Sequence, residues 1–186
     1  MSTNTPYRPA EDTWLLEDSL RNIRDVNRSV EVGCGTGYIT KILSEKSRDV
    51  IAIEKDIQSA YDARDYLKDV LGNIHIIIAD GMSPINDYAK IDLIVSNPPY
   101  LPSDETLHDQ TIHGGPTGVE TSEEIIKQAL PFLRRGGELF LISSSLGDQE
   151  KLLETIHQFG LSAEILNSRR MFFEEIICLK IYQAQK

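Results

Sequence analysis

The stretch that decides the fold is Glu31-Val-Gly-Cys-Gly-Thr-Gly37, a glycine-rich turn between a predicted strand, Ser29–Gly33, and a predicted helix, Tyr38–Ser47. Glycine lets a backbone turn tightly and approach a ligand where a side chain would collide. The spacing here is G-x-G-x-G. A dinucleotide fingerprint is G-x-G-x-x-G, whose last glycine would replace Tyr38. The turn therefore predicts a cofactor site, but one that matches a nicotinamide poorly.

Apolar runs alternate with segments of helical period on both sides of this turn. Such nearly continuous runs are typical of strands buried on both faces of a parallel sheet. Alternation of strands and helices with short connections predicts right-handed βαβ units in an α/β fold with a doubly wound sheet. Besides Ser29–Gly33 and Tyr38–Ser47, the predicted strands are Val50–Glu54, Ile74–Ile78, Asp92–Ser96 and Glu138–Ser143, and the predicted helices are Ile57–Leu71, Ser122–Leu133 and Asp148–Phe159.

The C-terminal part departs from this alternation. Ser162–Asn167 and Ile176–Tyr182 both have strand character, with only a polar bend around Ser168–Arg170 and its neighbours between them. That spacing is too short for a helix and predicts an antiparallel hairpin. We therefore expect seven strands, mostly parallel, in one domain over residues 1–186. Residues 1–28 form a helical cap segment, with a short helix starting near Ala10, and residues 29–186 form the core.

Composition excludes several classes of protein. The chain has 186 residues, of which 40% are hydrophobic, and a net charge of -10 from 19 Lys and Arg against 29 Asp and Glu. No run approaches the 18 apolar residues of a membrane span, and the first residues lack the pattern of a signal peptide, so we expect a cytoplasmic protein. Cys34 and Cys178 are too few for a disulfide scaffold or a structural zinc site. The excess of acidic over basic residues argues against binding to the negatively charged backbone of a nucleic acid.

Acidic residues stand at the ends of three successive predicted strands. These carboxyl ends meet at the edge of an open sheet where ligands bind. Glu31 suits the amino group of an amino acid, and Glu54, 21 residues after Gly33, suits two ribose hydroxyls. Asp80, followed by Gly81, suits the exocyclic amine of an adenine. Each acid alone could be a helix cap or a solvated residue, but together they describe S-adenosylmethionine.

The fourth strand leads into Asn97-Pro98-Pro99-Tyr100. Two prolines make this turn stiff and leave its carbonyls free, because proline has no N–H to donate. A planar amide or aromatic amine is a weak nucleophile whose two N–H groups could donate to the Asn97 side chain and the Pro98 carbonyl. Tyr100 could stack on the flat group. Alignment with a methyl group, rather than a strong base, would then supply most of the catalysis.

These motifs resemble those of the class I S-adenosylmethionine-dependent methyltransferases of the HemK-like group, which modify glutamine N5 in translation release factors. The group's E-x-G-x-G-x-G corresponds to Glu31–Gly37, and its N-P-P-Y to Asn97–Tyr100. The opening Tyr7–Leu16 is similar to the P-A-E-D-T-F-L-L of the short eukaryotic and archaeal branch, with Trp14 in place of Phe. Gly114–Glu120 resembles that branch's G-G-x-x-G-x-E.

The resemblance implies a Rossmann-like seven-stranded methyltransferase fold with a C-terminal antiparallel hairpin, and S-adenosylmethionine as cofactor. The substrate would be the glutamine side-chain amide in the Gly-Gly-Gln loop of a class I peptide chain release factor. No metal is implied. The implied catalytic residues are Asn97, Pro98 and Tyr100, and the implied cofactor contacts are Thr13, Glu31, Gly33, Gly35, Gly37, Glu54, Asp80, Gly81 and Asn97.

The short branch also works with a small zinc-binding methyltransferase activator. Ile74–Ile78 is expected at the sheet edge, where so apolar a strand would invite a partner strand, unless a helix or loop of the chain covers it.

Three rival functions stay open: an adenine-N6 methyltransferase acting on DNA or RNA, a protein lysine methyltransferase, and a binding module without activity. The segment from Leu101 to Lys127 contains six acidic residues and a single basic one, Lys127. This negative charge favours a basic protein loop as substrate over a nucleic acid. These acids are Asp104, Glu105, Asp109, Glu120, Glu123 and Glu124. The long loop Leu101–Thr121 is of a length that is usually functional or disordered.

Overall fold

The computed structural model describes residues 9–103 and 112–184. Within them, seven strands form one sheet in the order β3-β2-β1-β4-β5-β7-β6, which confirms the predicted α/β fold with a C-terminal antiparallel hairpin. The strands are β1 (Val26–Val32), β2 (Ser47–Glu54), β3 (Ile74–Ile78), β4 (Leu93–Ser96), β5 (Glu138–Ser144), β6 (Ser162–Arg170) and β7 (Glu175–Tyr182). The helices are α1 (Glu11–Leu20), α2 (Tyr38–Lys46), α3 (Ile57–Leu67), α4 (Glu120–Leu133) and α5 (Gln149–Gln158), and a 3-10 turn η1 spans Leu71–Asn73.

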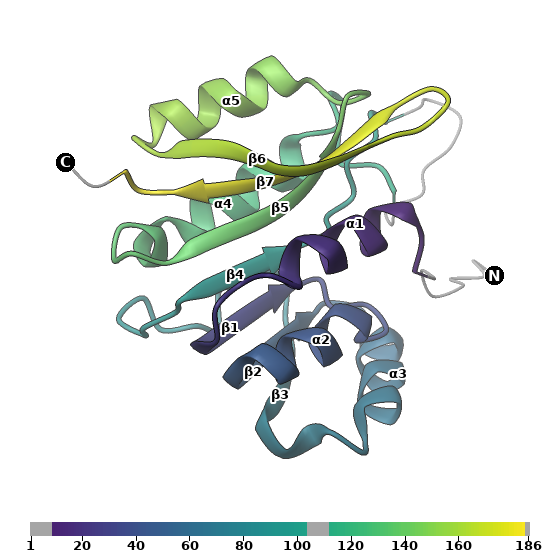
Figure 1. Cartoon of the computed structure of the whole chain (residues 1–186), viewed down its shortest axis with the longest axis vertical. Helices are drawn as coiled ribbons and strands as arrows, with labels where there is room; N and C mark the ends of the chain where they lie inside the picture. Colours follow the sequence, from purple (N-terminus) through teal and green to yellow (C-terminus); the bar gives the residue numbers. More distant parts are fainter. Residues whose placement is uncertain (1–8, 104–111, 185–186) are drawn as a thin grey trace.

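Helices cover both faces of the sheet. Figure 1 shows α1 and α2 in front of it and α4 behind it. Side chains alternate along β5, so that Leu139 and Leu141 pack in the core shared with α4 and α5, while Phe140 and Ile142 pack in the core shared with α1, α2 and α3. Each such side chain contributes about 1.5–3 kcal/mol when fully buried. Burial on both faces is why these strands are nearly continuous apolar runs.

The first five strands are parallel, so their carboxyl ends reach the same edge of the sheet. Val32 pairs with Ile53 of β2 and with Ser96 of β4, and Glu54 pairs with Ile78 of β3. A buried hydrogen bond from the Ser96 hydroxyl to the Val32 carbonyl, 2.8 Å long, ties the ends of β4 and β1 together. The turns that follow these strands are thereby gathered into one region.

The predicted bend at Ser168–Arg170 is wrong. Strand β6 continues to Arg170, with Arg169 opposite Ile176, and the turn follows at residues 171–174, where Met171 N donates to the Glu174 carbonyl. The Arg169 side chain pairs with Glu11 and Asp18 of α1. The polar residues that suggested a turn therefore belong to an edge strand, in which Arg169 is held by ion pairs to a helix far away in the sequence.

Other boundaries shift by a few residues. Strand β1 begins at Val26 instead of Ser29, because the Asp92 carboxylate accepts hydrogen bonds from the backbone N–H groups of Asn27 and Arg28. Helix α3 ends at Leu67 instead of Leu71, and η1 begins at Leu71 after a short turn. No helix in the described ranges is long and apolar enough to cross a membrane.

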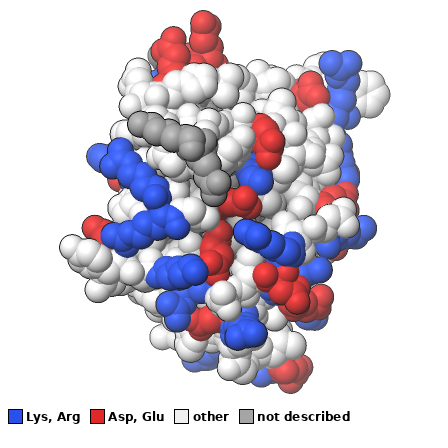
Figure 2. All heavy atoms as spheres, turned by 60° about the vertical axis from the view of Figure 1, so that its left-hand side comes forward, with Lys and Arg blue, Asp and Glu red and all other residues white. Residues whose placement is uncertain are grey.

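Charges are mixed on the face at the amino-terminal ends of the parallel strands. Figure 2 shows Lys and Arg side chains there interspersed with Asp and Glu. Several of them pair: Arg28 lies 2.5 Å from Asp49, and Lys180 lies 2.9 Å from Glu138. The opposite end of the sheet, by contrast, holds the predicted site.

Candidate active site

A large cleft opens at the carboxyl ends of β1, β2, β3 and β4. Its volume is about 1970 Å³, well above the roughly 300–1,000 Å³ of a pocket for one small ligand. The cleft therefore has room for a cofactor together with a side chain from another molecule. Of the residues predicted from the sequence, it is lined by Thr13, Glu31, Gly33, Gly35, Glu54, Asp80, Gly81, Asn97, Pro98 and Tyr100.

The glycine loop leaves open space above its backbone. Gly33 and Gly35 have φ of 76° and 52°, and a Cβ built on either would meet nothing within 4 Å. The loop is held against β2, because the N–H groups of Gly33 and Cys34 both donate to the Ile53 carbonyl. The loop is thus a well-anchored surface on which a ligand could lie close to the backbone.

Gly37 serves a different purpose and does not line the cleft. It precedes α2 with φ of 85°, and a Cβ there would lie 2.9 Å from Leu67 Cδ1 of α3. The third glycine therefore allows α2 and α3 to pack closely, and the structure separates it from the other predicted cofactor contacts.

Glu31 is a buried carboxyl at the base of the cleft, only 5% exposed. The Thr40 hydroxyl of α2 donates to its Oε2. Burial, with a smaller contribution from the nearby Glu54, raises the pKa of Glu31 to about 8 against the opposing effect of the Thr40 hydrogen bonds. In the free protein at neutral pH, Glu31 is therefore largely protonated, and a cation beside it would favour its charged form.

Glu54 and Asp80 end the next two strands. Glu54 is buried, and its two oxygens accept from Gly35 N and Asp56 N, each at 2.9 Å. A carboxylate has about four acceptor positions, so two are left for a ligand. Asp80 is exposed on the cleft wall. Beside it, Gln128 of α4 accepts from Met82 N at 2.6 Å and fixes the chain after Gly81.

The Asn97–Tyr100 turn presents an unused acceptor. Asn97 Oδ1 is buried and has no hydrogen-bond partner within residues 9–103 and 112–184. An unsatisfied buried acceptor costs about 1–3 kcal/mol, which a ligand donating to it would recover. The Tyr100 hydroxyl donates to Asp12 Oδ2 of α1 at 3.1 Å, and this bond orients the ring.

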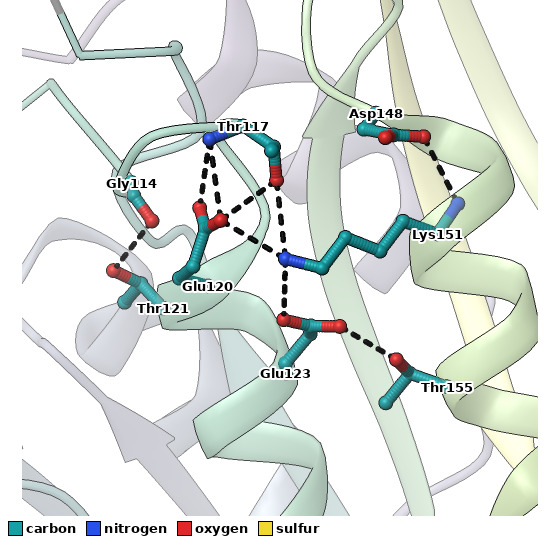
Figure 3. Close-up of polar contacts among 8 residues, drawn as sticks. All are labelled: Gly114, Thr117, Glu120, Thr121, Glu123, Asp148, Lys151 and Thr155. Atoms are coloured by element: carbon teal, nitrogen blue, oxygen red, sulfur yellow. Dashed lines mark hydrogen bonds and ion pairs between the residues drawn. The ribbon is translucent and has the colours of Figure 1, made fainter.

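A network of polar contacts links Thr117, Glu120 and Lys151 (Figure 3). Glu120 accepts from the Thr117 N–H and hydroxyl and from Lys151 Nζ of α5, which also lies 3.1 Å from Glu123 Oε2. Burial alone would raise the pKa of Glu120, but the bonds from Lys151 and Thr117 outweigh it and hold the pKa at about 2. Glu120 is therefore charged across the physiological range.

Close backbone contacts connect this network to the turn. Gly114 N donates to the Leu101 carbonyl at 2.9 Å. Gly114 lies so close to the Pro99 carbonyl, and Gly118 so close to the Tyr100 carbonyl, that neither has space for a Cβ. The ion pairs of Lys151 therefore belong to a network of contacts that reaches the backbone of the Asn97–Tyr100 turn.

The cysteine and histidine side chains lie in different surroundings. Both thiols are buried, and burial raises the pKa of Cys178 to about 11 and that of Cys34 still higher, so both stay protonated and unreactive. His75 is an exposed strand residue 2.9 Å from Asp49. His113 lines the cleft. His108, like Asp104, Glu105 and Asp109, lies outside the described residues, among which no three potential metal ligands gather.

Sequence reasoning missed three supporting residues: Asp12, Thr40 and Lys151. Asp12 stands in the quoted opening motif, which was the only available signal. Thr40 is one helical turn past the glycine loop, and nothing local links it to Glu31. Lys151 is 31 residues from Glu120, so no motif connects them.

Comparison with known proteins identifies the family. The family model of the methyltransferase small domain matches residues 11–171. The chain belongs to the methyltransferase small domain family. With the strand order given above, this makes it an S-adenosylmethionine-dependent methyltransferase of class I fold, as the sequence predicted.

Relatives within the family confirm the resemblance to the HemK-like group. A Methanocaldococcus jannaschii protein, whose name proposes protein N5-glutamine methyltransferase activity, is 29% identical over 185 residues, covering 95% of this chain and 91% of its own. Human methyltransferase HEMK2 is 28% identical, covering 96% and 90%. The solved structures include the Mtq2–Trm112 complex of E. cuniculi, which is responsible for methylation of the translation termination factor eRF1. One chain of that complex is similar to this methyltransferase with a TM-score of 0.76 and 25% sequence identity. The match covers 96% of this chain and 98% of that chain.

Proposed function

We propose that this methyltransferase transfers a methyl group from S-adenosylmethionine to the side-chain amide nitrogen of the glutamine in the Gly-Gly-Gln loop of a class I release factor. The observation that carries the proposal is Asn97 Oδ1, a buried acceptor in the cleft without a partner in the described ranges. An amide N–H would satisfy it. The HemK-like relatives and the eRF1-methylating complex support glutamine as the acceptor.

The residues divide into two groups in this proposal. S-adenosylmethionine supplies an electrophilic methyl group on a sulfonium. Glu31 would hold the cofactor's ammonium, Glu54 its ribose hydroxyls and Asp80 its adenine amine, while Thr13, Gly33, Gly35 and Gly81 would complete the binding surface. The cleft fits this ligand because Gly33 and Gly35 leave open space and the buried Glu31 lacks a cationic partner in the part of the chain described.

The Asn97–Tyr100 turn acts on the acceptor. Asn97 Oδ1 and the Pro98 carbonyl accept the two amide N–H groups, which directs the nitrogen lone pair toward the methyl carbon. In the transfer an N–C bond would replace the C–S bond of the cofactor, and the methylated amide would release one proton to solvent as the product leaves. Tyr100, held by Asp12, covers the flat amide and excludes water. Catalysis then comes mainly from alignment.

The charge of the cleft favours a protein substrate. Its described lining holds nine carboxyl groups and one lysine, Lys55. Such a surface repels the phosphates of an adenine-bearing nucleic acid and attracts a basic polypeptide. A lysine acceptor needs no amide alignment, so Asn97 favours glutamine over lysine. The carboxyl groups belong to Glu11, Asp12, Glu31, Glu54, Asp56, Asp80, Glu120, Glu124 and Glu174.

We also propose a small zinc-binding activator as partner, seated on β3. This strand is at the sheet edge, as predicted, and Ile78 on it is 48% exposed. Partner-strand pairing would cover both the free backbone groups and the apolar side chains of the edge. The presence of Trm112 beside Mtq2 in the E. cuniculi complex supports this assignment.

Site-resolved mass spectrometry tests the proposed reaction. A purified release factor is incubated with the methyltransferase, the activator and S-adenosylmethionine. We expect one methyl group on the Gly-Gly-Gln glutamine with the wild type and none with Asn97→Ala, whose cofactor affinity by calorimetry stays within a few-fold of wild type. An unmodified glutamine despite cofactor binding would refute the acceptor. Loss of cofactor binding in Asn97→Ala would refute the role of Asn97.

A further inference from the structure

Two phenylalanines stand almost fully in solvent at the tip of the β6–β7 hairpin. Phe172 is 100% exposed and Phe173 91%, and their ring centroids are 6.3 Å apart. Neither belongs to the two hydrophobic cores of the described chain. An adjacent pair of exposed aromatic rings has no role in folding stability and is typical of an interaction site.

The hairpin places this pair at the cleft. Strand β7 runs antiparallel to β5, with Ile176 opposite Ser144, so the hairpin tip lies at the carboxyl end of the parallel strands. Figure 1 shows the hairpin extending past the other strands at that end. Residues on either side of the pair, Met171 and Glu174, line the cleft itself. A polypeptide whose side chain enters the cleft could therefore reach Phe172 and Phe173 at its rim.

We infer that Phe172 and Phe173 form a docking site for the protein substrate, and that they insert into an apolar depression next to its acceptor glutamine. This inference rests on the proposed function. Two features indicate that the partner bound there is the protein substrate. The rim is continuous with the cleft, and the acidic lining of the cleft suits a polypeptide with basic residues around its acceptor glutamine. Aromatic anchors beside a charged rim are typical of protein interfaces.

The orientation of the tip is well defined by the rest of the fold. Met171 N donates to the Glu174 carbonyl at 2.7 Å and closes the turn, while Ser144 Oγ donates to Glu174 Oε2 at 2.7 Å. Glu175 N donates to Ser145 Oγ at 2.8 Å. The two rings are thus presented by an ordered turn, so docking requires little loss of backbone entropy.

The test compares an intact substrate with a peptide. The variant carries Phe172→Ser and Phe173→Ser, and the control is Tyr88→Ser, which removes an 84% exposed aromatic ring that does not line the cleft. The wild type and both variants are assayed with the activator on two substrates, a purified release factor and a short synthetic Gly-Gly-Gln peptide. We expect KM for the release factor to rise about ten-fold or more in the double variant, the loss typical of removing aromatic anchors, with kcat unchanged. KM for the peptide, cofactor affinity and all values for Tyr88→Ser should match the wild type.

The outcomes are distinguishable. Equal KM values for the release factor in double variant and wild type would overturn the docking site while leaving the proposed function intact. No transfer to either substrate by the wild type would overturn the proposed function and this inference with it. Sedimentation of the wild type, but not the double variant, with phosphatidylcholine–phosphatidylserine vesicles, together with an unchanged KM, would assign the pair to a membrane surface and overturn the inference.

Discussion

The charge state of Glu31 leads to a prediction that links stability to cofactor binding. Its pKa is about 8 in the folded protein against 4.5 for an unperturbed glutamate. Between these values the folded state binds more protons than the unfolded state, so the contribution of Glu31 to stability is lost as pH rises from 4.5 to about 8. At about 1.4 kcal/mol per pKa unit, the loss from about pH 6 to about pH 9 is about 3 kcal/mol.

Glu31→Gln removes this dependence while keeping the shape of the side chain and an oxygen for the Thr40 hydroxyl. We expect the stability of the free variant relative to the wild type to increase by about 3 kcal/mol between about pH 6 and about pH 9, which corresponds to about 6–12 °C in Tm for a chain of this length. The measurement is thermal and urea unfolding of both proteins across this range. The exposed Glu124, changed to Gln, is the control and should show no such difference.

Cofactor binding should change in the opposite direction. Glu31→Gln cannot pair with the ammonium of S-adenosylmethionine, and loss of a charged hydrogen bond of about 1.5–3 kcal/mol weakens binding about ten-fold or more near pH 8. Calorimetry at that pH measures it. A stability difference that is constant with pH would refute the reasoning, because Glu31 would then be a structural group rather than a charge held ready for a cation.

Two further substitutions test the supports of the Asn97–Tyr100 turn. Tyr100→Phe keeps the ring but removes the hydroxyl that bonds Asp12, and we expect kcat to fall about ten-fold through misalignment with cofactor affinity unchanged. An unchanged kcat in single-turnover assays would contradict this role. Lys151→Met leaves Glu120 without its cation, so KM for the release factor should rise several-fold, with partial recovery in Lys151→Arg. Steady-state kinetics check this, and equal KM values in all three proteins would exclude positioning by Lys151.

The strand ends could be read from the sequence because their signals are local. The predicted Ile74–Ile78 coincides with β3, and the strand before Asn97 ends at Ser96 as expected. An apolar run reports burial on both faces whatever its partners are. Since parallel strands end at one edge, Glu31, Glu54, Asp80 and the Asn97 turn had to converge once the strands were parallel.

The hairpin was predicted, but the length of its first strand and the position of its turn could not be read in this way. Polar residues after Asn167 have the composition of a turn, yet β6 continues because Arg169 meets Glu11 and Asp18 of α1. Those partners are about 150 residues earlier in the chain, so no window of sequence contains both. Gly37 was grouped with its neighbours for the same reason: only the position of Leu67 reveals that it serves helix packing.

The sequence by itself determined the α/β class, the parallel arrangement of the first five strands and the side chains that line the cleft at the strand ends. Periodicity and short motifs encode these properties within a few residues. Only the tertiary structure decided that Glu31 is largely protonated, that Asp12 accepts a hydrogen bond from Tyr100 and that Lys151 pairs with Glu120 near the Asn97–Tyr100 turn. Desolvation and ion pairing depend on which distant residues surround a group, and that arrangement exists only once the chain has folded.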